Sequence, residues 1–434
     1  MRASLNPFSS AVGSAYAPIG GSFTVTLGKM LDAGREADPS ARELPYIRAG
    51  NIQDTGLDLS SVNTMPFTEC EAATLNLRRG DVLVVEGGAV GTCVVLDSDL
   101  PGWSFQKTVN RVRPVGDSSS QYLAYVLRAY RDAGIIDIVC NKSTIPHLTA
   151  EKLRALRIPS WAPGVQRAIA DYLDRVTGRI DMLIAEQQKL IKLLGERRQA
   201  LIEKRVACGL DDRTSFKTST LAWTEKVPTH WRVANIRRFA QMKTGHTPSR
   251  SVPEYWENCT IPWFTLADVW QLRDSRRMYL GETSSLISED GLANSAAELL
   301  PAGTVVLSRT ASVGFAGIMP TAMATSQDFW NWMCGPELEP AYLVYVFRAM
   351  RNEFQALMIG STHKTIYQPV AAAMRIPVPP LDEQRGIVAH LDEQTARIDT
   401  LIAESERFIE LARERRAALI TAAVTGQIDV REVA

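Results

Sequence analysis

The sequence predicts an α/β (α+β) fold, in which two mixed α/β domains are separated by two long antiparallel coiled-coil helices with pseudo-two-fold symmetry. Two observations lead to this prediction. The phrase RIDMLIAE at 179–186 returns as RIDTLIAE at 397–404. Each copy lies in a proline-free stretch whose apolar residues alternate at spacings of three and four, a pattern typical of a coiled-coil seam.

Internal duplication covers most of the chain. Setting residues 173–203 against 391–421 without a gap gives 18 identities in 31 positions. The match continues upstream, where 157–173 aligns with 375–391, 121–131 with 341–351 and 77–85 with 300–308. The chain therefore consists of two tandem copies of a unit of roughly 200 residues. We expect the matching parts to do the same job twice, and the diverged N-terminal parts to do related jobs on different targets.

The duplicated pattern divides the chain into segments. We assign a flexible N-terminal tail to 1–21, the first α/β domain to 22–165, the first long helix to 166–213, a linker to 214–222, the second α/β domain to 223–380, the second long helix to 381–426 and a C-terminal tail to 427–434. Each domain holds two β-rich runs around a glycine-containing turn, at 81–97 and 303–320, followed by a helix at 121–131 and 341–351.

The two long helices are expected to pack on each other, because two apolar seams in one chain favour a common antiparallel interface. The alternative is that each helix closes only its own domain. A helix of ~40 residues would be ~60 Å long. The expected seam consists of Leu173, Val176, Ile180, Leu183, Leu190, Leu194, Leu201, Leu391, Ile398, Leu401, Phe408 and Leu419, with Ile184, Ile191, Ile402 and Ile409 widening the stripe.

Composition disfavours several classes of protein. Lys plus Arg and Asp plus Glu each number 48, and this balance weakly disfavours a purely electrostatic nucleic-acid binder, although charge can be segregated between surfaces. No apolar run approaches ~18 residues, so no membrane-spanning helix is expected. The six cysteines occur singly and form no ligand spacing with the five histidines. This pattern fits a reducing cytoplasm and predicts no metal site.

No catalytic motif stands out. The P-loop, the dinucleotide-binding GxGxxG, GxSxG, HExxH and the zinc deaminase signature are all missing. GGAVGT at 87–92 sits between two β-rich runs, where a hairpin turn is the better interpretation. We therefore expect no catalytic residues in this chain.

Several stretches resemble the DNA-specificity (S) subunit of type I restriction-modification systems. They are LPYIRAGNIQDTG at 44–56, VPTHWRVANIRRFAQMKTGHTPSR at 227–250, IPWFTLADV at 261–269, SQDFWNW at 326–332 and IPVPPLDEQRGIVAHLDEQTARIDTLIAE at 376–404. The resemblance extends from about residue 22 to 427. The first copy departs from it twice: Val165 stands where Glu383 does, and the Pro-x-x-Trp of Pro228 and Trp231 has no counterpart.

The resemblance implies two target-recognition domains, each reading one half of an asymmetric bipartite site in double-stranded DNA, with the helices as a spacer. It implies a non-catalytic cytoplasmic subunit of a multisubunit adenine DNA methyltransferase/endonuclease. Such a subunit docks two methyltransferase (modification) subunits and, in the full enzyme, two restriction/translocase subunits. No cofactor is expected on this chain, whereas S-adenosylmethionine, ATP and Mg are expected on the partners.

The loops of both domains hold residue types that read bases: Asn and Gln suit adenine, Arg and Lys suit guanine, and Ser and Thr suit either. The DNA-binding candidates of the first domain are Arg48, Asn51, Gln53, Lys107, Asn141, Lys142 and Ser143. Those of the second are Lys243, Thr244, His246, Ser249, Arg250, Arg309, Thr310, Gln327, Ser361, Thr362, His363 and Lys364. Each is also compatible with a solvated loop residue or a local turn bond, but KTGHTPSR and GSTHKT are stronger as groups.

Two other functions compete with this hypothesis. A coiled-coil scaffold whose α/β domains bind proteins rather than DNA would show no DNA affinity with any partner. A self-contained enzyme with an unrecognised site would turn over nucleotide or modify DNA by itself.

Overall fold

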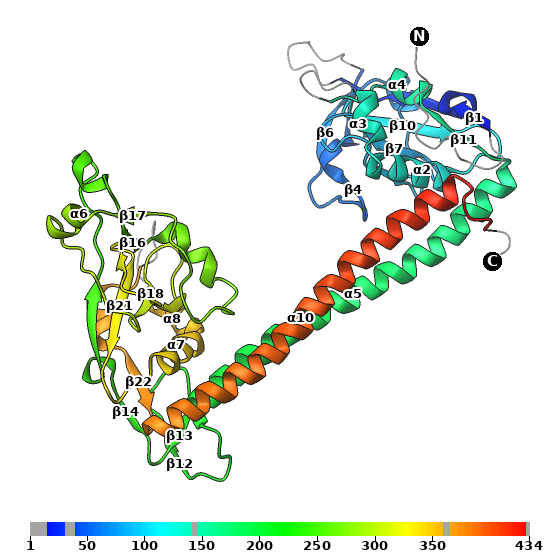
Figure 1. Ribbon diagram of the computed structural model, residues 1–434. Helices are drawn as coiled ribbons and strands as arrows, with labels where there is room; N and C mark the ends of the chain where they lie inside the picture. Colours follow the sequence, from blue (N-terminus) through cyan, green and yellow to red (C-terminus); the bar gives the residue numbers. More distant parts are fainter. Residues whose placement is uncertain (1–14, 31–39, 141–145, 359–364, 431–434) are drawn as a thin grey trace. The chain divides into compact units, whose positions relative to one another are not determined.

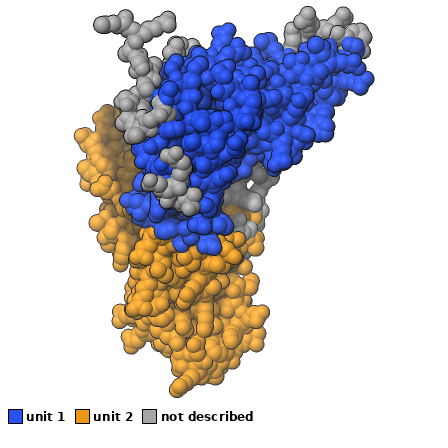
Figure 2. Space-filling view, turned by 90° about the vertical axis from the view of Figure 1, so that its right-hand side faces the viewer, with its two compact units in different colours: residues 1–187, 407–434 blue, residues 188–406 orange. Residues whose placement is uncertain are grey.

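The chain divides into two compact units, each with one α/β domain and a segment of each long helix (Figures 1 and 2). The computed structural model describes residues 15–30, 40–140, 146–358 and 365–430. Unit 1 comprises residues 1–187 and 407–434, and unit 2 comprises residues 188–406. The predicted class, two mixed α/β domains with two long helices, is confirmed.

Domain 1 lies in unit 1 and precedes the first long helix. Its elements are β1 (Ala15–Pro18), η1 (Ile19–Gly21), β2 (Phe23–Leu27), β3 (Arg42–Ile47), η2 (Ala49–Asn51), β4 (Ile52–Gln53), β5 (Gly56–Leu57), β6 (Asn63–Phe67), α1 (Glu69–Thr74), β7 (Val82–Val85), β8 (Cys93–Val95), β9 (Ser104–Phe105), β10 (Val109–Pro114), α2 (Ser120–Asp132), α3 (Ile135–Cys140), α4 (Ala150–Ala155) and β11 (Arg157–Ser160).

Domain 2 lies in unit 2 between the two long helices. Its elements are β12 (Phe216–Thr218), β13 (Lys226–Pro228), β14 (Arg232–Asn235), η3 (Ile236–Arg238), β15 (Ala240–Thr244), η4 (Pro253–Trp256), β16 (Ile261–Phe264), η5 (Leu266–Leu272), β17 (Leu286–Ile287), α6 (Glu289–Ala293), β18 (Val305–Ser308), β19 (Ala316–Ile318), β20 (Ala324–Thr325), β21 (Phe329–Cys334), α7 (Pro340–Ala349), α8 (Arg351–Leu357), α9 (Gln368–Ala373) and β22 (Arg375–Val378).

The two domains share one sheet topology, as expected of duplicated sequence. A four-stranded antiparallel sheet has the order β2-β10-β7-β8 in domain 1 and β15-β21-β18-β19 in domain 2. A three-stranded sheet, β6-β3-β9 or β17-β16-β20, pairs its last two strands in parallel. The first and last strands of each domain pair as β1-β11 or β14-β22. The short pairs β4-β5 and β12-β13 differ between the domains.

One of the two inner strands of each four-stranded sheet, β7 or β18, is buried on both faces. Val82 and Val84 of β7 belong to the hydrophobic cluster that includes α2, whereas Leu83 and Val85 belong to a second cluster. Because side chains alternate along a strand, burial on both faces requires an apolar residue at every position. This explains the continuous run VLVV, and β18 is divided between two clusters in the same way.

The long helices are α5 (Pro163–Cys208) and α10 (Leu381–Val424). α5 begins at a proline, which is tolerated in a first helical turn because the N–H groups there have no intrahelical partner. Near each start, a glutamine fastens the helix to its own domain. Gln166 accepts from the Ser119 N–H (2.9 Å), and Gln384 accepts from the Glu339 N–H (2.8 Å).

The segments of α5 and α10 run antiparallel within each unit. In unit 1, Trp161 donates to the carbonyl of Val424 (3.1 Å), and Asp181, further along α5, pairs with Arg416, earlier in α10 (3.0 Å). In unit 2, Arg198 pairs with Asp399 (3.1 Å). Asp181 and Asp399 are the aspartates of the repeated phrase, so the same ion pair is made twice.

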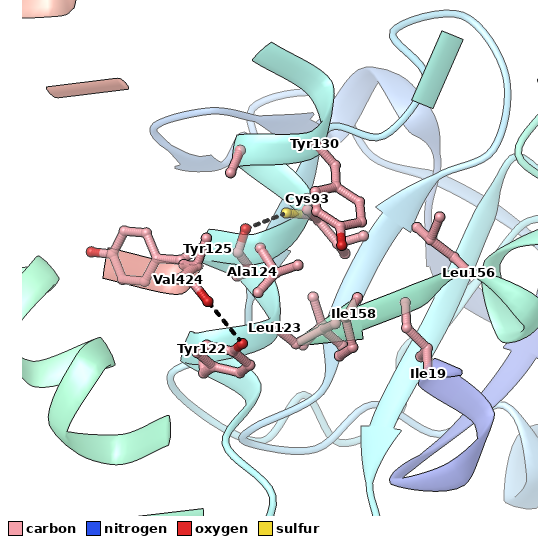
Figure 3. Close-up of a cluster of buried hydrophobic side chains, with 14 of the residues drawn as sticks. Ile19, Cys93, Tyr122, Leu123, Ala124, Tyr125, Tyr130, Leu156, Ile158 and Val424 are labelled. Carbon is pink, nitrogen blue, oxygen red and sulfur yellow. Dashed lines mark hydrogen bonds between the residues drawn. The ribbon is translucent and has the colours of Figure 1, made fainter. Parts of the chain in front are cut away.

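Each domain core is completed by the end of the helix that belongs to the other copy. Tyr122 donates to the carbonyl of Val424 (3.4 Å), in a cluster that includes Ile420 and Ala423 (Figure 3). Tyr342 donates in the same way to the carbonyl of Val206 (3.3 Å). Domain 1 therefore needs the end of α10, and domain 2 needs the end of α5.

The seam prediction needs a correction at alternate positions. Leu173, Leu194, Leu391 and Ile398 are buried, and Val176, Ile180, Leu201 and Leu419 are half-buried. In contrast, Leu183 is 45% exposed, Leu190 42%, Leu401 48% and Phe408 42%.

The buried stripe passes one residue further along the helix at those positions. Ile402 and Ile409 are buried, and Ile184 and Ile191 are half-buried. The prediction missed this register because a seam through Ile184 and Ile402 also passes through Thr177 and Thr395, seven residues earlier, and threonine is polar. The buried hydroxyl of each bonds to the carbonyl four residues earlier (both 2.7 Å), so a polar residue is tolerated there.

Two segment assignments also need correction. Residues 15–21, assigned to the tail, form β1 and η1, because β1 pairs with β11 and Ile19 is fully buried. Residues 214–222, assigned to a linker, contain β12, which pairs with β13. Within the described ranges, no helix is both long and apolar enough to cross a bilayer.

Substituting two leucines of α5 should separate the buried seam from the exposed face. Leu173→Ala should lower the free energy of unfolding by about 2–5 kcal/mol, because it leaves a cavity in the core of unit 1. Leu183→Ala should change it by less than about 0.5 kcal/mol, as expected for a surface site. Urea unfolding followed by tryptophan fluorescence measures both, and equal losses would place Leu183 in the seam after all.

Candidate functional site

Arg48 and Lys107, two of the predicted site residues of domain 1, lie in loops that meet at one end of the four-stranded sheet. The Ala49 N–H donates to the Thr108 hydroxyl (3.2 Å), which brings the loop after β3 to the loop after β9. The Glu86 N–H donates to the Thr108 carbonyl (2.9 Å), and the Leu148 N–H donates to the Glu86 carbonyl (2.8 Å). We call this set loop end 1, and its side chains are Arg48, Glu86, Lys107 and His147.

Domain 2 has the same arrangement at the same end of its sheet. The Arg309 N–H donates to the Asp328 carbonyl (2.9 Å), and the Ile366 N–H donates to the Arg309 carbonyl (2.9 Å). The His246 N–H donates to the Thr325 carbonyl (3.0 Å). We call this set loop end 2, and its side chains are His246, Arg250, Arg309 and Gln327.

Glycine makes one of these loop contacts possible in each domain. A Cβ at Gly28 would lie 2.3 Å from the Gln106 carbonyl oxygen, and one at Gly245 would lie 2.1 Å from that of Thr325. Only glycine permits so close an approach of two backbones. The two loop ends therefore share a backbone framework, while their side chains differ.

The guanidinium of Arg309 has a fixed orientation in loop end 2. Its guanidinium lies over the Trp330 ring (4.2 Å to the centroid), and Nε donates to the Gln327 carbonyl (2.7 Å). Its terminal nitrogens donate to no residue that the structure describes. Burial lowers the pKa of Arg309, and the nearby Asp328 opposes this effect. A planar, oriented guanidinium of this kind suits bidentate hydrogen bonding.

Glu86 occupies the same backbone position in loop end 1. One carboxylate oxygen, Oε2, is buried without a hydrogen-bond partner among the described residues. Burial raises the pKa of Glu86, although His147 and Lys107 act in the opposite direction. A buried acceptor without a donor is costly, and it is satisfied when a donor arrives. Glu86 can therefore accept a hydrogen bond from a ligand.

Other side chains of loop end 2 are oriented by neighbours. Gln327 accepts from the Thr247 hydroxyl through its Oε1 atom (2.6 Å), which leaves its amide nitrogen as a donor. The His246 carbonyl accepts from the Trp263 indole (3.2 Å), so its backbone is fixed while its side chain is exposed. Arg250 lies over the Trp256 ring (5.3 Å to the centroid).

Two of the predicted residues use their side chains for contacts within their own domain. Asn51 is buried and accepts from the Arg48 N–H (3.1 Å), and its amide donates to the carbonyls of Asp58 (2.8 Å) and Ser61 (2.9 Å). Its polar atoms are thus used within the loop, and it does not face a ligand. Lys243 is engaged by Glu298 in an ion pair (2.7 Å).

The remaining described candidates make only long side-chain contacts or are exposed or half-buried. Arg48 and Gln53 make long contacts to Ser61 (3.4 Å) and Asp58 (3.3 Å), and Lys107 is exposed. Among the others, Thr244 and Ser249 are exposed and Thr310 is half-buried. The candidates Asn141, Lys142, Ser143, Ser361, Thr362, His363 and Lys364 lie outside the described residues.

Sequence reasoning missed Glu86 and His147 of loop end 1, and Thr247 of loop end 2. The available signal was the alignment of 77–85 with 300–308, because the residues that directly follow, Glu86 and Arg309, stand at equivalent strand ends with opposite charge. Within the described part of the chain, no cluster of three or more His, Cys, Asp or Glu side chains could hold a metal ion.

Comparisons with known proteins agree with the duplicated fold. Residues 18–193 and 228–410 each match the family model of the type I restriction modification DNA specificity domain. The type I restriction enzyme MjaIX specificity subunit of Methanocaldococcus jannaschii is 27% identical over 203 residues. This alignment covers 46% of the present chain and 45% of that subunit, so the chain spans less than half of the relative's length.

Two solved structures share the fold over nearly the whole chain. One, from work described as the structural basis of complex assembly and conformational transition of the type I R-M system, has a TM-score of 0.74 at 17% identity and covers 96% of this chain and 99% of its own. The HsdS subunit of Thermoanaerobacter tengcongensis has a TM-score of 0.56 at 17% identity and covers 96% and 98%. With both copies matched by the family model, the chain belongs to the type I restriction modification DNA specificity family.

Proposed function

We propose that this chain reads a bipartite DNA site, one half with each loop end, as the specificity subunit of a type I methyltransferase. The observation that carries the proposal is the pair of loop ends, in which one set of backbone hydrogen bonds holds diverged polar side chains. Loops on a rigid framework are the usual place for binding residues. Two related but different loop ends suit a target with two different halves.

The side chains of the two loop ends favour different bases. Arg309, whose terminal nitrogens donate to no residue that the structure describes, suits the acceptor pair of guanine, and Gln327 suits adenine. Glu86 suits the amino group of cytosine, because a carboxylate or carboxyl oxygen accepts a hydrogen bond from it. The nearby Lys107 supplies a positive charge for a phosphate. The two halves of the site should therefore differ in sequence.

The long helices supply the second part of the proposal, the spacing between the half-sites. α5 is a continuous helix of 46 residues and α10 one of 44. A stiff helix pair loses little conformational entropy when DNA binds, whereas a flexible linker would lose more. We propose that the register of the helix pair sets the number of base pairs between the half-sites.

The exposed apolar face of each helix supplies the third part, the docking of two methyltransferase subunits. Leu183, Leu190 and Leu193 are all more than 40% exposed on α5, and Leu401, Phe408 and Leu411 repeat the same positions on α10. Spacings of seven and three place each set on one helix face, beside the buried seam. Exposed apolar faces of this kind mark interaction sites.

The duplication of this face favours two copies of one partner, one on each helix. The catalytic chemistry would then belong to the partners, with adenine as the methylated base. S-adenosylmethionine would be held by the methyltransferase subunits, and ATP and Mg²⁺ by any restriction subunits. A protein-binding scaffold is less favoured, because it gives no reason why Glu86 Oε2 and the terminal nitrogens of Arg309, at equivalent positions, have no hydrogen-bond partner among the described residues.

Arg309→Ala should relax specificity in one half of the site only. Losing a bidentate base contact should cost about 1–3 kcal/mol of discrimination at one base pair. Glu86→Ala should relax one position in the other half. Methylome sequencing of cells that express the chain with its methyltransferase measures both, and Lys226→Ala, far from both loop ends in sequence, serves as a control. Relaxation spread evenly over both halves would contradict the assignment of one half to each domain.

Shortening both helices by one heptad should shorten the spacer of the DNA site. Deleting residues 186–192 and 405–411 keeps the register of both Arg–Asp ion pairs and removes about 10 Å of helix. At 3.4 Å per base pair this corresponds to about three base pairs. Because the deletion also removes Leu190, Phe408 and Leu411 of the proposed docking faces, the spacer is read from random DNA duplexes selected by the purified chain and not from methylation. An unchanged spacer with intact half-sites would exclude the helices as the ruler.

Charge on the exposed apolar faces should remove the methyltransferase subunits one at a time. Leu190→Asp and Phe408→Asp should each leave one methyltransferase bound, and the double variant should leave none, because a buried unpaired carboxylate is costly. Lys192→Asp is the matched control, since Lys192 is exposed on the opposite face of α5. Size-exclusion chromatography with light scattering gives the stoichiometry. Full assembly of the double variant would place the docking surface elsewhere.

A further inference from the structure

Domain 2 covers the edge strand β19 with a segment of its own chain. The Leu280 N–H donates to the Ile318 carbonyl (2.9 Å), and the Ile318 N–H donates to the Met278 carbonyl (2.9 Å). Residues 278–280 thus pair in parallel with the outer edge of β19. Because Ile318 turns both of its backbone groups away from β18, this pairing satisfies groups that the sheet itself leaves open.

The preceding residues of this segment bind helices. Arg348 of α7 donates to the Arg277 carbonyl (2.5 Å), and Arg198 of α5 donates to the Ser275 carbonyl (2.7 Å). The Arg276 side chain lies 3.7 Å from the Asp399 carboxylate of α10. Residues 275–280, which we call the covering segment, are therefore held by an edge strand, by α7 and by the helix pair of unit 2.

Among its described residues, domain 1 has no covering segment, because the corresponding connection is shorter. The connection joins the strands β3 and β6 in domain 1, and β16 and β17 in domain 2, which pair in the same register. The connection consists of residues 48–62 in domain 1 and of the longer stretch 265–285 in domain 2. In domain 1 it folds into the short hairpin β4-β5 instead.

A cavity of about 470 Å³ lies at the corresponding place in domain 1. Six of the residues that line it, from the hairpin, from β8 and its following loop, and from α2, are Leu57, Val95, Asp97, Gln121, Tyr125 and Arg128. Val95 stands where Ile318 stands in domain 2, since each pairs with the first residue of the neighbouring strand, Val82 or Val305. Its outward N–H and carbonyl meet no backbone group of the described residues.

The groups that hold the covering segment in domain 2 have counterparts in unit 1 whose donors are only partly used by the described residues. Arg128 corresponds to Arg348; one of its terminal nitrogens donates to the Asp54 carbonyl (3.2 Å), and its Nε atom, like that of Arg348, is buried without a hydrogen-bond partner among the described residues. Arg416 corresponds to Arg198, and its terminal nitrogens donate to no described residue, although its Nε pairs with Asp181. Asp181 in turn corresponds to Asp399, the carboxylate that faces Arg276.

We propose that the outer edge of β8 and the adjoining cavity form a docking site for an extended peptide segment of a partner protein. That segment would pair with Val95, offer carbonyl groups to Arg128 and Arg416, and carry a basic residue before an apolar residue, as the covering segment does. Addition of a strand to an exposed sheet edge is an established mode of peptide recognition. Duplex DNA fits less well, because Asp97 in the lining repels phosphate and Asp54 is already paired with Arg131 (2.7 Å).

A peptide of residues 272–283 of this chain, LRDSRRMYLGET, is a suitable probe, because it contains the covering segment. Fluorescence anisotropy with the full chain should show saturable binding with a dissociation constant of about 10⁻⁵–10⁻⁴ M. Val95→Pro should weaken binding at least about tenfold, because proline removes the outward N–H and leaves the pairing with β7 intact. The peptide variant R276E/R277E/M278D should bind at least about tenfold more weakly.

Val62→Pro is the matched control, since Val62 is exposed in the same domain, lies outside the cavity lining and donates no backbone hydrogen bond to a described residue. It should bind the peptide as the unaltered chain does, and thermal unfolding should show that both proline variants are folded. Three results would overturn the proposal: no saturation up to about 1 mM peptide, equal affinity in Val95→Pro, or displacement of the peptide by duplex DNA. Methylation by the assembled enzyme is a separate readout, so the two proposals fail independently.

Discussion

Antiparallel packing of α5 against α10 is the constraint on which both domains depend. Tyr122 of domain 1 reaches the carbonyl of Val424, and Tyr342 of domain 2 reaches that of Val206. Burial of a residue such as Ile420 or Val424 contributes about 1.5–3 kcal/mol, so neither copy can complete its core from its own residues. The repeated Arg–Asp pair makes the register explicit, because the same two positions of the repeat meet in each unit. Because the sequence is duplicated, the end of each long helix fits the core of the other copy's domain in the same way.

The sequence predicted the duplication and the antiparallel helices, but it placed part of the seam one residue too early. A heptad through Val176 and Leu183 is apolar at both positions, whereas the observed seam passes through Thr177 and Ile184. Only the structure shows that the Thr177 hydroxyl is satisfied inside the helix. A helix with two apolar faces makes such an error hard to avoid, because hydrophobicity does not tell which partner a face meets. The two departures of the first copy from the family pattern concern residues that contact each other in the second copy. The Trp231 indole donates to Glu383 (2.9 Å), so a copy without the carboxylate would leave such an indole without this acceptor.

The loop ends were predictable as regions but not residue by residue. Composition marked Asn51 as a base reader, yet its amide closes the loop around Asp58 and Ser61. An asparagine that caps a turn and one that faces DNA look identical in sequence, because the difference lies in whether long-range folding brings carbonyl groups within reach. Glu86 was passed over because an acidic residue does not suggest DNA. Its significance depends on burial and on its equivalence to Arg309, and both are three-dimensional properties.

The charge reversal between Glu86 and Arg309 also bears on the zero net charge of the chain. A subunit that bound DNA mainly through phosphates would need an excess of basic residues on both domains. If Glu86 contacts a base as proposed, a carboxyl there is tolerated only when its repulsion of phosphate is small. Burial raises the pKa of Glu86 and so favours its neutral form. The backbone bonds that hold this position do not depend on the side chain, so its charge can change without loss of the loop framework. Base contacts would then supply the selectivity of this chain, and the assembled partners would supply much of the electrostatic affinity.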